Sequence, residues 1–315
     1  MKVVVQIPCL NEEKTLPLVL KSIPKKIKGV DEVVVLIIDD GSTDKTIAIA
    51  KKHGVKHIVK HARNMGLARS FHDGLNYALS IGADIVVNTD GDNQYPQGKI
   101  PELVKPIVDG KADIVIADRQ TAKIAHFSPL KKLLQRFGSY VVNKAAGTEI
   151  PDAVSGFRAY SKKSLLRLNI VTTFSYCTET IIQAGNKRLA IASVPIKTNP
   201  KTRESRLFKS TWQHVRKSAA AIIRAFIMYK PWAVFGSLAV ILFFAGLIPF
   251  LRYMIFVIDG VGGAHLQSLI AGSILLIASF LSLTLGIVAD LIRINRILIE
   301  DQLERIKIRQ YGERN

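Results

Sequence analysis

The chain has 315 residues, of which 48% are hydrophobic, and it carries a formal net charge of +19. This length suits one large domain or two smaller ones, and the charge favours a negative partner such as nucleic acid, a phosphate-bearing ligand or an anionic membrane. The two cysteines, Cys9 and Cys177, exclude a disulfide framework and a CxxC metal site, and they favour the reducing side of a membrane. The opening residues MKVVVQIPCLNEE lack the pattern of a signal peptide, because their apolar run is short.

Strands and helices are predicted to alternate along the N-terminal two-thirds of the chain. Short β-branched apolar runs are typical of strands buried on both faces. The predicted strands are 2–8, 33–38, 84–89 and 113–118, and the predicted helices are about 12–22, 43–53, 67–81 and 100–109. This alternation predicts an α/β domain with a mostly parallel sheet and helices on both sides.

Acidic and polar side chains follow each predicted strand. In such a sheet, ligands bind beyond the carboxyl ends of the strands. The segments at these ends are 8–12, 39–44, 90–92 and 118–119. A single acidic loop can be a helix cap, and Ser42 or Thr43 suits that role. Several converging acidic loops in a basic protein predict a functional site instead.

These loops do not carry the common phosphate-binding motifs. No GxGxxG follows the first strand and no GxxxxGK[ST] occurs, so hydride transfer and P-loop phosphoryl transfer lose support. Asp90 and Asp92 offer a different chemistry, because two carboxylates at a strand end can hold a hard divalent cation. Mg²⁺ or Mn²⁺ bound in this way can bridge a diphosphate and stabilise it as it departs.

Two uncharged apolar segments lie near the C-terminus. Roughly 20 helical residues cross the hydrocarbon core of a bilayer, so both segments are long enough to span it. We expect transmembrane helices at about 231–257 and 266–289, joined by a loop that contains no Lys or Arg. Two buried core helices are the alternative, which the absence of a polar face disfavours. Basic residues flank the pair, so the positive-inside rule predicts a hairpin with both ends in the cytosol.

The segment before the first span has the pattern of an interfacial helix. Its apolar side chains recur at spacings of four and three, while basic side chains lie off this stripe. A basic amphipathic helix that runs into a span is typical of the membrane interface, although packing on the soluble domain is the alternative. The stripe consists of Phe208, Trp212, Val215, Ala219, Ile222 and Phe226.

Six segments in order resemble a known family. They are IPCLNEEKTL (7–16), IIDDGSTDKT (37–46), NMGLARSFHDGL (64–75), DGDNQYP (90–96), DAVSGFRAYS (152–161) and TRESRLFKS (202–210). The chain is similar to inverting family 2 glycosyltransferases of the GT-A fold. More closely, it resembles the polyprenyl-phosphate glycosyltransferases, which include dolichol-phosphate mannose synthase and bacterial undecaprenyl-phosphate glucosyltransferases. A two-span hairpin after these segments also fits the bacterial members.

The resemblance implies a domain organisation. It predicts a cytosolic GT-A domain over 1–206, interfacial helices over 207–230, two transmembrane helices within 231–290 and a basic cytosolic tail over 291–315. The tail is expected to be a solvated helix or a contact to lipid headgroups. The protein is thus expected in the cell (inner) membrane as a multi-pass protein, with its catalytic domain and both ends cytosolic.

The resemblance also implies roles for the matching residues. The nucleoside pocket would be lined by Pro8, Leu10 and Glu12, with Asp39 or Asp40 near the base and ribose. The metal on the donor diphosphate would be held by Asp90 and Asp92, with Gly91 and Gln94 beside them and Arg119 facing the phosphates. The acceptor side would be bordered by Asp152, Ser155 and Arg158, with Arg203 and Arg206 on phosphate at the membrane surface.

The implied reaction moves a sugar from a nucleotide diphosphate to a polyprenyl (undecaprenyl) phosphate, with Mg²⁺ or Mn²⁺ as cofactor. The resemblance to the bacterial two-span members favours UDP-glucose as donor, followed by GDP-mannose and other UDP sugars. Mannose synthases tend to carry Gly-x-Ser-Lys where this chain reads TRESR, which weakens the case for GDP-mannose. A lipid phosphate is already anionic near neutrality, so a strong general base is not expected to be essential. The candidate catalytic residues are Asp92, Asp152 as a base with Glu179 behind it, and Arg158 for the acceptor phosphate.

Two other classes of protein are the alternatives to a polyprenyl-phosphate glycosyltransferase. A processive polysaccharide synthase would need more spans and a QxxRW-like motif, and neither is visible. A non-catalytic membrane-anchored binding protein or a nucleic-acid binder would explain the charge, but not the acids at the strand ends. We therefore expect a nucleotide sugar, a polyprenyl phosphate and the bilayer as partners, and no nucleic acid. Homo-oligomerisation is left open.

Overall fold

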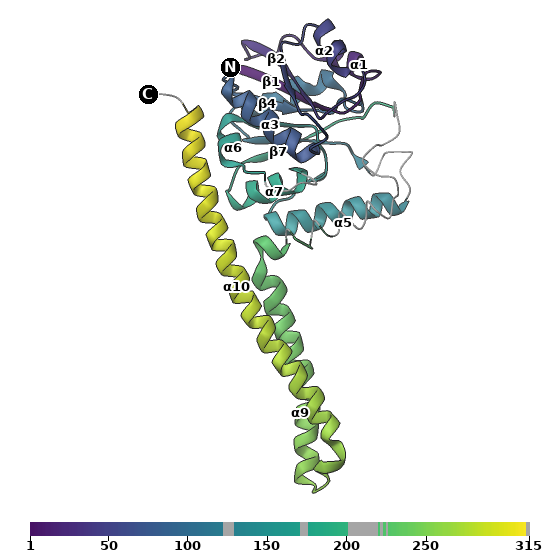
Figure 1. Ribbon diagram of the computed structural model, residues 1–315, viewed down its shortest axis with the longest axis vertical. Coiled ribbons are helices and arrows are strands. Elements are labelled where there is room, and N and C mark those ends of the chain that lie inside the picture. Colours follow the sequence, from purple (N-terminus) through teal and green to yellow (C-terminus); the bar gives the residue numbers. More distant parts are fainter. Residues whose placement is uncertain (122–128, 171–175, 201–219, 221–222, 225, 313–315) are drawn as a thin grey trace. The chain divides into compact units, whose positions relative to one another are not determined.

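The computed structural model describes residues 1–121, 129–170, 176–200, 220, 223–224 and 226–312 (Figure 1). The chain divides into two compact units, the first comprising Met1–Ile222 with Glu300–Asn315 and the second Ile223–Ile299. Most of the segment predicted as interfacial helices, and both Arg203 and Arg206, lie outside the described residues.

A seven-stranded sheet forms the centre of the first unit, with the strand order β3-β2-β1-β4-β6-β5-β7. Its strands are β1 (Lys2–Cys9), β2 (Glu32–Asp39), β3 (His57–Lys60), β4 (Ile85–Asn88), β5 (Ile114–Asp118), β6 (Arg158–Ser161) and β7 (Ile191–Pro195). Pairing is parallel except where β6 runs antiparallel between β4 and β5. This mixed, mostly parallel GT-A-like α/β domain confirms the predicted fold class.

Helices cover both faces of the sheet. They are α1 (Leu16–Ser22), α2 (Thr46–Lys52), α3 (Leu67–Ser80), α4 (Ile100–Val108), α5 (Pro129–Ala146), α6 (Lys162–Arg167) and α7 (Tyr176–Asn186). Alternate residues of β1 point to opposite faces, so Val3, Val5 and Ile7 pack in the core with α1 and α4. On the other face, α3 lies close to Gln6. This close approach is possible because Gly74 has no side chain, since a Cβ there would lie 2.6 Å from Gln6 Oε1.

The four predicted strands and the four predicted helices are present, although each helix begins at or after its predicted start. The sequence missed β3, β6 and β7, because HIVK, RAYS and IASVP are short and contain polar residues. It also missed α5 and α7, which pack on one another where Gly185 meets the Ala146 carbonyl.

The second unit contains two long apolar helices, α9 (Ser237–Ile258) and the first part of α10 (Leu266–Tyr311), which run side by side in Figure 1. Gly246 and Gly272 let the two backbones approach closely, since a Cβ on Gly272 would lie 3.0 Å from the Gly246 carbonyl oxygen. Ser279 Oγ also donates to the Ala239 carbonyl across the pair over 2.8 Å.

Both apolar helices are long and apolar enough to cross a membrane, judged by length and composition. Only 11% of the most apolar window of the first helix and 17% of that of the second are buried in this structure, whereas the core helix of a soluble protein is mostly buried. This favours the spanning interpretation over the core-helix alternative.

The C-terminal tail is helical and contacts the first unit at a few residues. Helix α10 continues without a break to Tyr311, and its last turns belong to the first unit. There Glu304 forms ion pairs with Arg167 at 3.1 Å and Lys187 at 3.4 Å, and Lys307 donates to the Leu168 carbonyl over 2.6 Å. The predicted tail is thus a helix whose side chains are mostly exposed, with Glu304 and Lys307 packing beside α6 and α7.

Candidate active site

The loops after β1 and β2 brace one another at the carboxyl edge of the sheet. The Asn11 N–H donates to Ser42 Oγ over 2.9 Å, and the Glu12 N–H donates to Thr46 Oγ1 over 2.8 Å. These bonds join the two loops into one wall, which we call the donor wall (residues 8–12 and 39–44). It contains the residues predicted to line the nucleoside pocket, Pro8, Leu10 and Glu12.

The two aspartates predicted near the base and ribose have different surroundings. Asp40 uses both carboxylate oxygens, accepting from the N–H groups of Met65 over 2.8 Å and Gly66 over 3.0 Å. Asp39 accepts from the Ser42 N–H over 3.3 Å with Oδ1, while its buried Oδ2 has no hydrogen-bond partner among the described residues. A buried oxygen without a partner is costly, so Asp39 is the better candidate for contacting a ligand.

Asp90, Gly91 and Asp92 follow β4 at the same edge. Both carboxylates are half-buried, and the backbone at Gly91 packs against the donor wall. A Cβ on Gly91 would lie 3.1 Å from Cys9 Sγ and 3.2 Å from Glu12 Cγ. The glycine therefore allows the two carboxylates to lie beside the predicted nucleoside pocket.

The two aspartates suit a hard divalent cation. Within the described part of the chain, no group of three or more His, Cys, Asp or Glu side chains could enclose a metal by itself. A cation on Asp90 and Asp92 would therefore take its other ligands from water and phosphate oxygens, which is how Mg²⁺ is usually held. Gln94 supports this turn, because its N–H donates to Asp92 Oδ1 over 3.1 Å. The residues present fit Mg²⁺ or Mn²⁺.

A buried polar network joins β4 to the turn before β6. Asn88 Nδ2 donates to Tyr176 Oη over 2.7 Å and to the Gly156 carbonyl over 2.9 Å. The Gly156 N–H donates to Tyr95 Oη over 3.0 Å, and a Cβ on Gly156 would lie 3.6 Å from Asp90 Oδ2. The network therefore holds the turn predicted to border the acceptor next to Asp90, the first aspartate of the predicted metal pair.

Arg119 and Asp152 form a bidentate ion pair. Arg119 Nε donates to Asp152 Oδ2 over 2.6 Å and Nη2 donates to Oδ1 over 2.9 Å. Burial opposes ionisation of Asp152, but the hydrogen bonds and charge of Arg119 outweigh it and lower its pKa below the ordinary value. The side chains are 16% and 3% exposed, so the residue predicted to face phosphate and the residue predicted as a base share one partly enclosed site.

Arg158 lies in the core, where its side chain is fully buried. It donates to the Ser155 carbonyl over 2.6 Å, the Ala153 carbonyl over 2.9 Å, the Cys177 carbonyl over 2.9 Å and Thr180 Oγ1 over 2.8 Å. Contact with an acceptor phosphate would require several of these bonds to break. Through these hydrogen bonds, Arg158 instead fixes the turn that contains Asp152.

Two other predicted residues lie near this turn. Ser155 is fully buried, and its hydroxyl has no hydrogen-bond partner among the described residues. Glu179 is 4% exposed on α7 and accepts from Gln183 Nε2 at 3.4 Å. Both belong to the buried surroundings of the site.

Three non-glycine residues at the edge of the sheet have left-handed backbone conformations. Asn11, Asn93 and Gln120 have φ angles of 56°, 62° and 49°, and they follow β1, β4 and β5. Such conformations are uncommon outside glycine and cluster at functional sites. Their position therefore supports the edge as the site, independently of the acidic residues.

Sequence reasoning missed three polar residues that organise the site: Asn88, Tyr95 and Tyr176. Tyr95 lies inside the matched segment DGDNQYP, which was the available signal. Asn88 interrupts the apolar run of β4, and a fully buried amide in such a strand needs partners. Nothing local indicates Tyr176, because its partners are distant in the sequence.

Residues 4–168, more than half of the chain, match the family described as Glycosyl transferase family 2. The chain therefore belongs to this family and is a hexosyltransferase with a GT-A-like domain. Within the family it is related to polyprenyl- and dolichyl-phosphate hexosyltransferases.

Two curated relatives and one solved structure illustrate the relationship. The UDP-N-acetylglucosamine–dolichyl-phosphate N-acetylglucosaminyltransferase of Methanococcus voltae is 30% identical over 61% of this chain and 83% of its own length. A low-salt glycan biosynthesis hexosyltransferase of Haloferax volcanii is 26% identical over 90% of this chain and 67% of its own length.

The solved structure is glucosyl-3-phosphoglycerate synthase of Mycobacterium tuberculosis in complex with Mn²⁺, UDP-glucose and phosphoglyceric acid. It is 21% identical, with a TM-score of 0.55 over 71% of this chain and 79% of that protein. At 21% identity, this structural likeness supports the fold alone and not a particular activity.

Proposed function

We propose that this protein transfers a hexose from a nucleotide-diphosphate sugar to a polyprenyl phosphate, in an inverting reaction that requires Mg²⁺ or Mn²⁺. One observation carries the proposal most: Asp90 and Asp92 lie beside the donor wall because Gly91 packs directly on Cys9 and Glu12. This arrangement supports a diphosphate-binding metal site next to a nucleoside pocket, as a nucleotide-sugar transferase needs.

On the donor side, Asp39 Oδ2 would accept from the nucleoside, since this buried oxygen has no hydrogen-bond partner in the part of the chain that the structure describes. Asp90 and Asp92 would hold the metal, which when bound offsets the charge that builds on the departing diphosphate. UDP-glucose is the favoured donor. Other UDP hexoses and GDP-mannose are the alternatives, because the described residues include no contact specific to one sugar.

On the acceptor side, the lipid phosphate supplies its own anionic oxygen, so the site must bring two anions together. Arg119 is positioned for this by Asp152, and its guanidinium can pair bidentately with phosphate. Asp152 is a weak base while Arg119 lowers its pKa. We therefore assign Asp152 to positioning Arg119. Arg203 and Arg206 remain candidates for the acceptor phosphate.

The two apolar helices suit an enzyme whose acceptor remains in a bilayer. We propose that they anchor the chain in the cell membrane with the sugar-transfer domain in the cytosol, as the flanking basic residues favour. Anchoring would raise the effective concentration of a lipid-borne phosphate near the site.

Calorimetry with the full chain tests the metal site. The wild-type protein is expected to bind UDP-glucose with Mn²⁺ and to lose most of that affinity in EDTA. Asp92→Asn is expected to weaken metal-dependent binding about 100-fold or more, because it removes one of two charged ligands. The control is Asp109→Asn, which changes a carboxylate at the exposed end of α4. Equal donor affinity for Asp92→Asn and wild type in Mn²⁺ would exclude the assigned metal site.

A further inference from the structure

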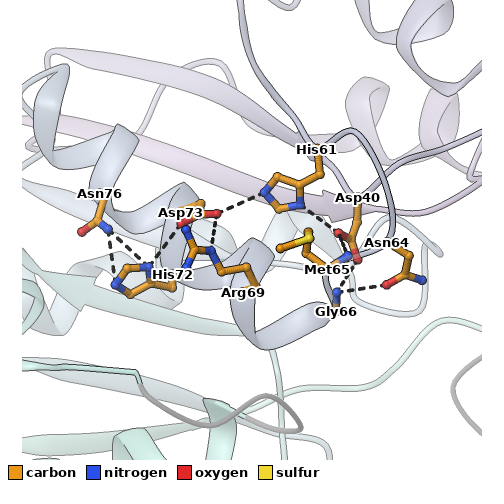
Figure 2. A network of polar contacts seen from close by, with 9 residues as sticks. All are labelled: Asp40, His61, Asn64, Met65, Gly66, Arg69, His72, Asp73 and Asn76. Atoms are coloured by element: carbon orange, nitrogen blue, oxygen red, sulfur yellow. Dashed lines mark hydrogen bonds and ion pairs between the residues drawn. The ribbon is translucent and has the colours of Figure 1, made fainter.

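A histidine lies between two carboxylates behind the donor wall. His61 Nδ1 is 2.8 Å from Asp40 Oδ1, and His61 Nε2 is 3.2 Å from Asp73 Oδ2 (Figure 2). The His61 and Asp40 side chains are only 10% and 8% exposed. Figure 2 shows the ring between the two carboxylates, with Asp73 on α3 and Asp40 directly after β2.

The number of hydrogen bonds that this ring can donate depends on its protonation. Asp40 accepts from two backbone N–H groups and therefore acts as an acceptor toward His61. Burial opposes ionisation of Asp73, but Arg69 and His72 on the same helix outweigh it and lower its pKa. An imidazole can donate to two acceptors only as the imidazolium, so both contacts are hydrogen bonds only when His61 carries a proton on each nitrogen.

Asp40 connects this ring to the loop before α3. It accepts from the Met65 and Gly66 N–H groups, so it secures the last residues of the loop 61–66. The loop also packs on the donor wall, because a Cβ on Gly41 would lie 2.7 Å from the Arg63 carbonyl carbon. Its first residue is tied as well, since the His61 N–H donates to the Asp39 carbonyl over 2.9 Å.

We propose that His61 is a positioning residue for the nucleotide sugar, which in its doubly protonated form clamps Asp40 between α3 and the loop 61–66. The clamp holds the donor wall, including the neighbouring Asp39, in the geometry that receives the nucleoside. When the imidazolium loses a proton, one nitrogen lone pair faces a carboxylate and the clamp loosens. Donor binding therefore weakens as the pH rises. This inference rests on the proposed function for the identity of the donor.

The charged groups that face the clamp are few. Asp40 approaches His61 from the β2 loop and Asp73 from α3, while Arg69 donates to Asp73 over 2.8 Å and His72 Nδ1 lies 3.3 Å from it. Arg69 and His72 contact Asp73 rather than His61. Of the two histidines, His61 is the one that contacts Asp40, so its protonation affects the clamp directly.

Steady-state kinetics of His61→Gln test the clamp. Glutamine keeps one amide donor but is never charged, so it can satisfy one carboxylate at any pH. We expect the donor KM of this variant to be about tenfold above wild type near pH 6, with kcat changed by less than about threefold, since one charge-assisted bond is lost. Between about pH 6 and about pH 9 the wild-type donor KM should rise, while that of His61→Gln stays flat.

The control is His53→Gln, which removes an exposed ring that contacts only the Ile49 carbonyl at the end of α2. It should keep the wild-type KM and its pH profile. Asp73→Asn is a second variant, because it keeps His61 but removes one charge from the clamp. The rise of its donor KM should begin at lower pH than in wild type.

A readout independent of turnover separates this inference from the proposed function. Hydrogen exchange at the Met65 and Gly66 amides, corrected for intrinsic exchange, should accelerate in His61→Gln and in wild type at high pH. A wild-type pH profile of the donor KM in His61→Gln, or unchanged exchange at both amides, would overturn the clamp. If no nucleotide sugar binds at all but the exchange result holds, the proposed donor fails and the clamp stands.

Discussion

At the scale of single residues, the site distinguishes carboxylates that look alike in the sequence. Asp39 and Asp40 are adjacent, yet Asp40 is saturated by backbone N–H groups and His61 while Asp39 keeps a buried oxygen without a described partner. Asp152 differs from both of them because it forms an ion pair with Arg119. Sequence patterns located these residues, but only the fold assigns their partners.

The first prediction concerns Arg119 and Asp152. If Asp152 positions Arg119, then Asp152→Asn and Arg119→Gln remove the same function, and the double variant should lose little more activity than the worse single variant. If Asp152 is instead a general base, the two losses are expected to multiply, because base and phosphate contact act separately. A double-mutant cycle of kcat/KM for the acceptor distinguishes the two results.

The pH dependence provides the control for this cycle. The pKa of Asp152 is lowered in the folded state, so the stability from its pairing is present above its unfolded pKa of about 3.9 and is lost only as the pH falls through the lower folded value. Asp152 should therefore stay ionised from about pH 5 upward. An acidic limb of kcat/KM above that pH, present in wild type and absent in Asp152→Asn, would contradict the positioning role.

At the scale of elements, β4 and the turn before β6 form the bridge between the donor and acceptor sides. The bridge depends on Tyr95, whose hydroxyl accepts the Gly156 N–H, and on Asn88, which donates to Tyr176. Gly156 lies close to Asp90 because it has no side chain. A shift of this turn would change the spacing between the metal pair and Asp152.

The second prediction concerns Tyr95→Phe. Removal of the hydroxyl leaves the buried Gly156 N–H without its acceptor, which costs about 1–3 kcal/mol of unfolding free energy. We expect a lower Tm and a decrease in kcat of about tenfold or more, because the turn is no longer held beside Asp90. Tyr140→Phe is the control, since Tyr140 is 61% exposed on α5. An unchanged kcat in Tyr95→Phe would show that the bridge does not set the geometry.

The elements that carry the site were predictable because their signals are local. Strands β1, β2, β4 and β5 are apolar and β-branched, and the acidic residues come directly after them. Strand β6 was not predictable, because it begins with Arg158, whose burial depends on carbonyl groups of the turn before it and of α7. The Arg119–Asp152 pair joins residues far apart in the sequence, and no spacing rule reports such a contact.

At the scale of the whole molecule, the second apolar helix does more than its predicted span. Helix α10 has 46 residues, about twice the number needed to cross a bilayer. Its last turns make ion pairs inside the first unit, with Glu304 between Arg167 and Lys187. The sequence predicted a span followed by a solvated helix, but the contacts of Glu304 depend on residues far away in the chain.

The third prediction tests this helix end. Glu304→Lys would place a third cation beside Arg167 and Lys187, so we expect the end of α10 to detach and its Arg and Lys residues to be cleaved several-fold faster by trypsin. Asp301→Lys on the same helix is the control, because Asp301 is 52% exposed and pairs with Arg305. Equal cleavage rates for the two variants would show that the ion pairs do not hold the helix end.

The charge of the molecule also fits its proposed substrates. The chain has a net charge of +19 although its predicted site is acidic, and in the proposed reaction that site binds a cation while the donor and acceptor are both anions. The basic surface would favour approach to an anionic membrane, where the acceptor lies.

The most direct test of this account is a donor screen with the full purified chain and undecaprenyl phosphate, read by the mass of the lipid product. We predict a polyprenyl-phosphate hexose with Mg²⁺ or Mn²⁺, greatest with UDP-glucose, and little product in EDTA or with Asp92→Asn. Product from GDP-mannose alone would correct the donor while leaving the reaction class intact. No lipid product from any UDP or GDP sugar, or a yield unaffected by EDTA, would contradict the central claim.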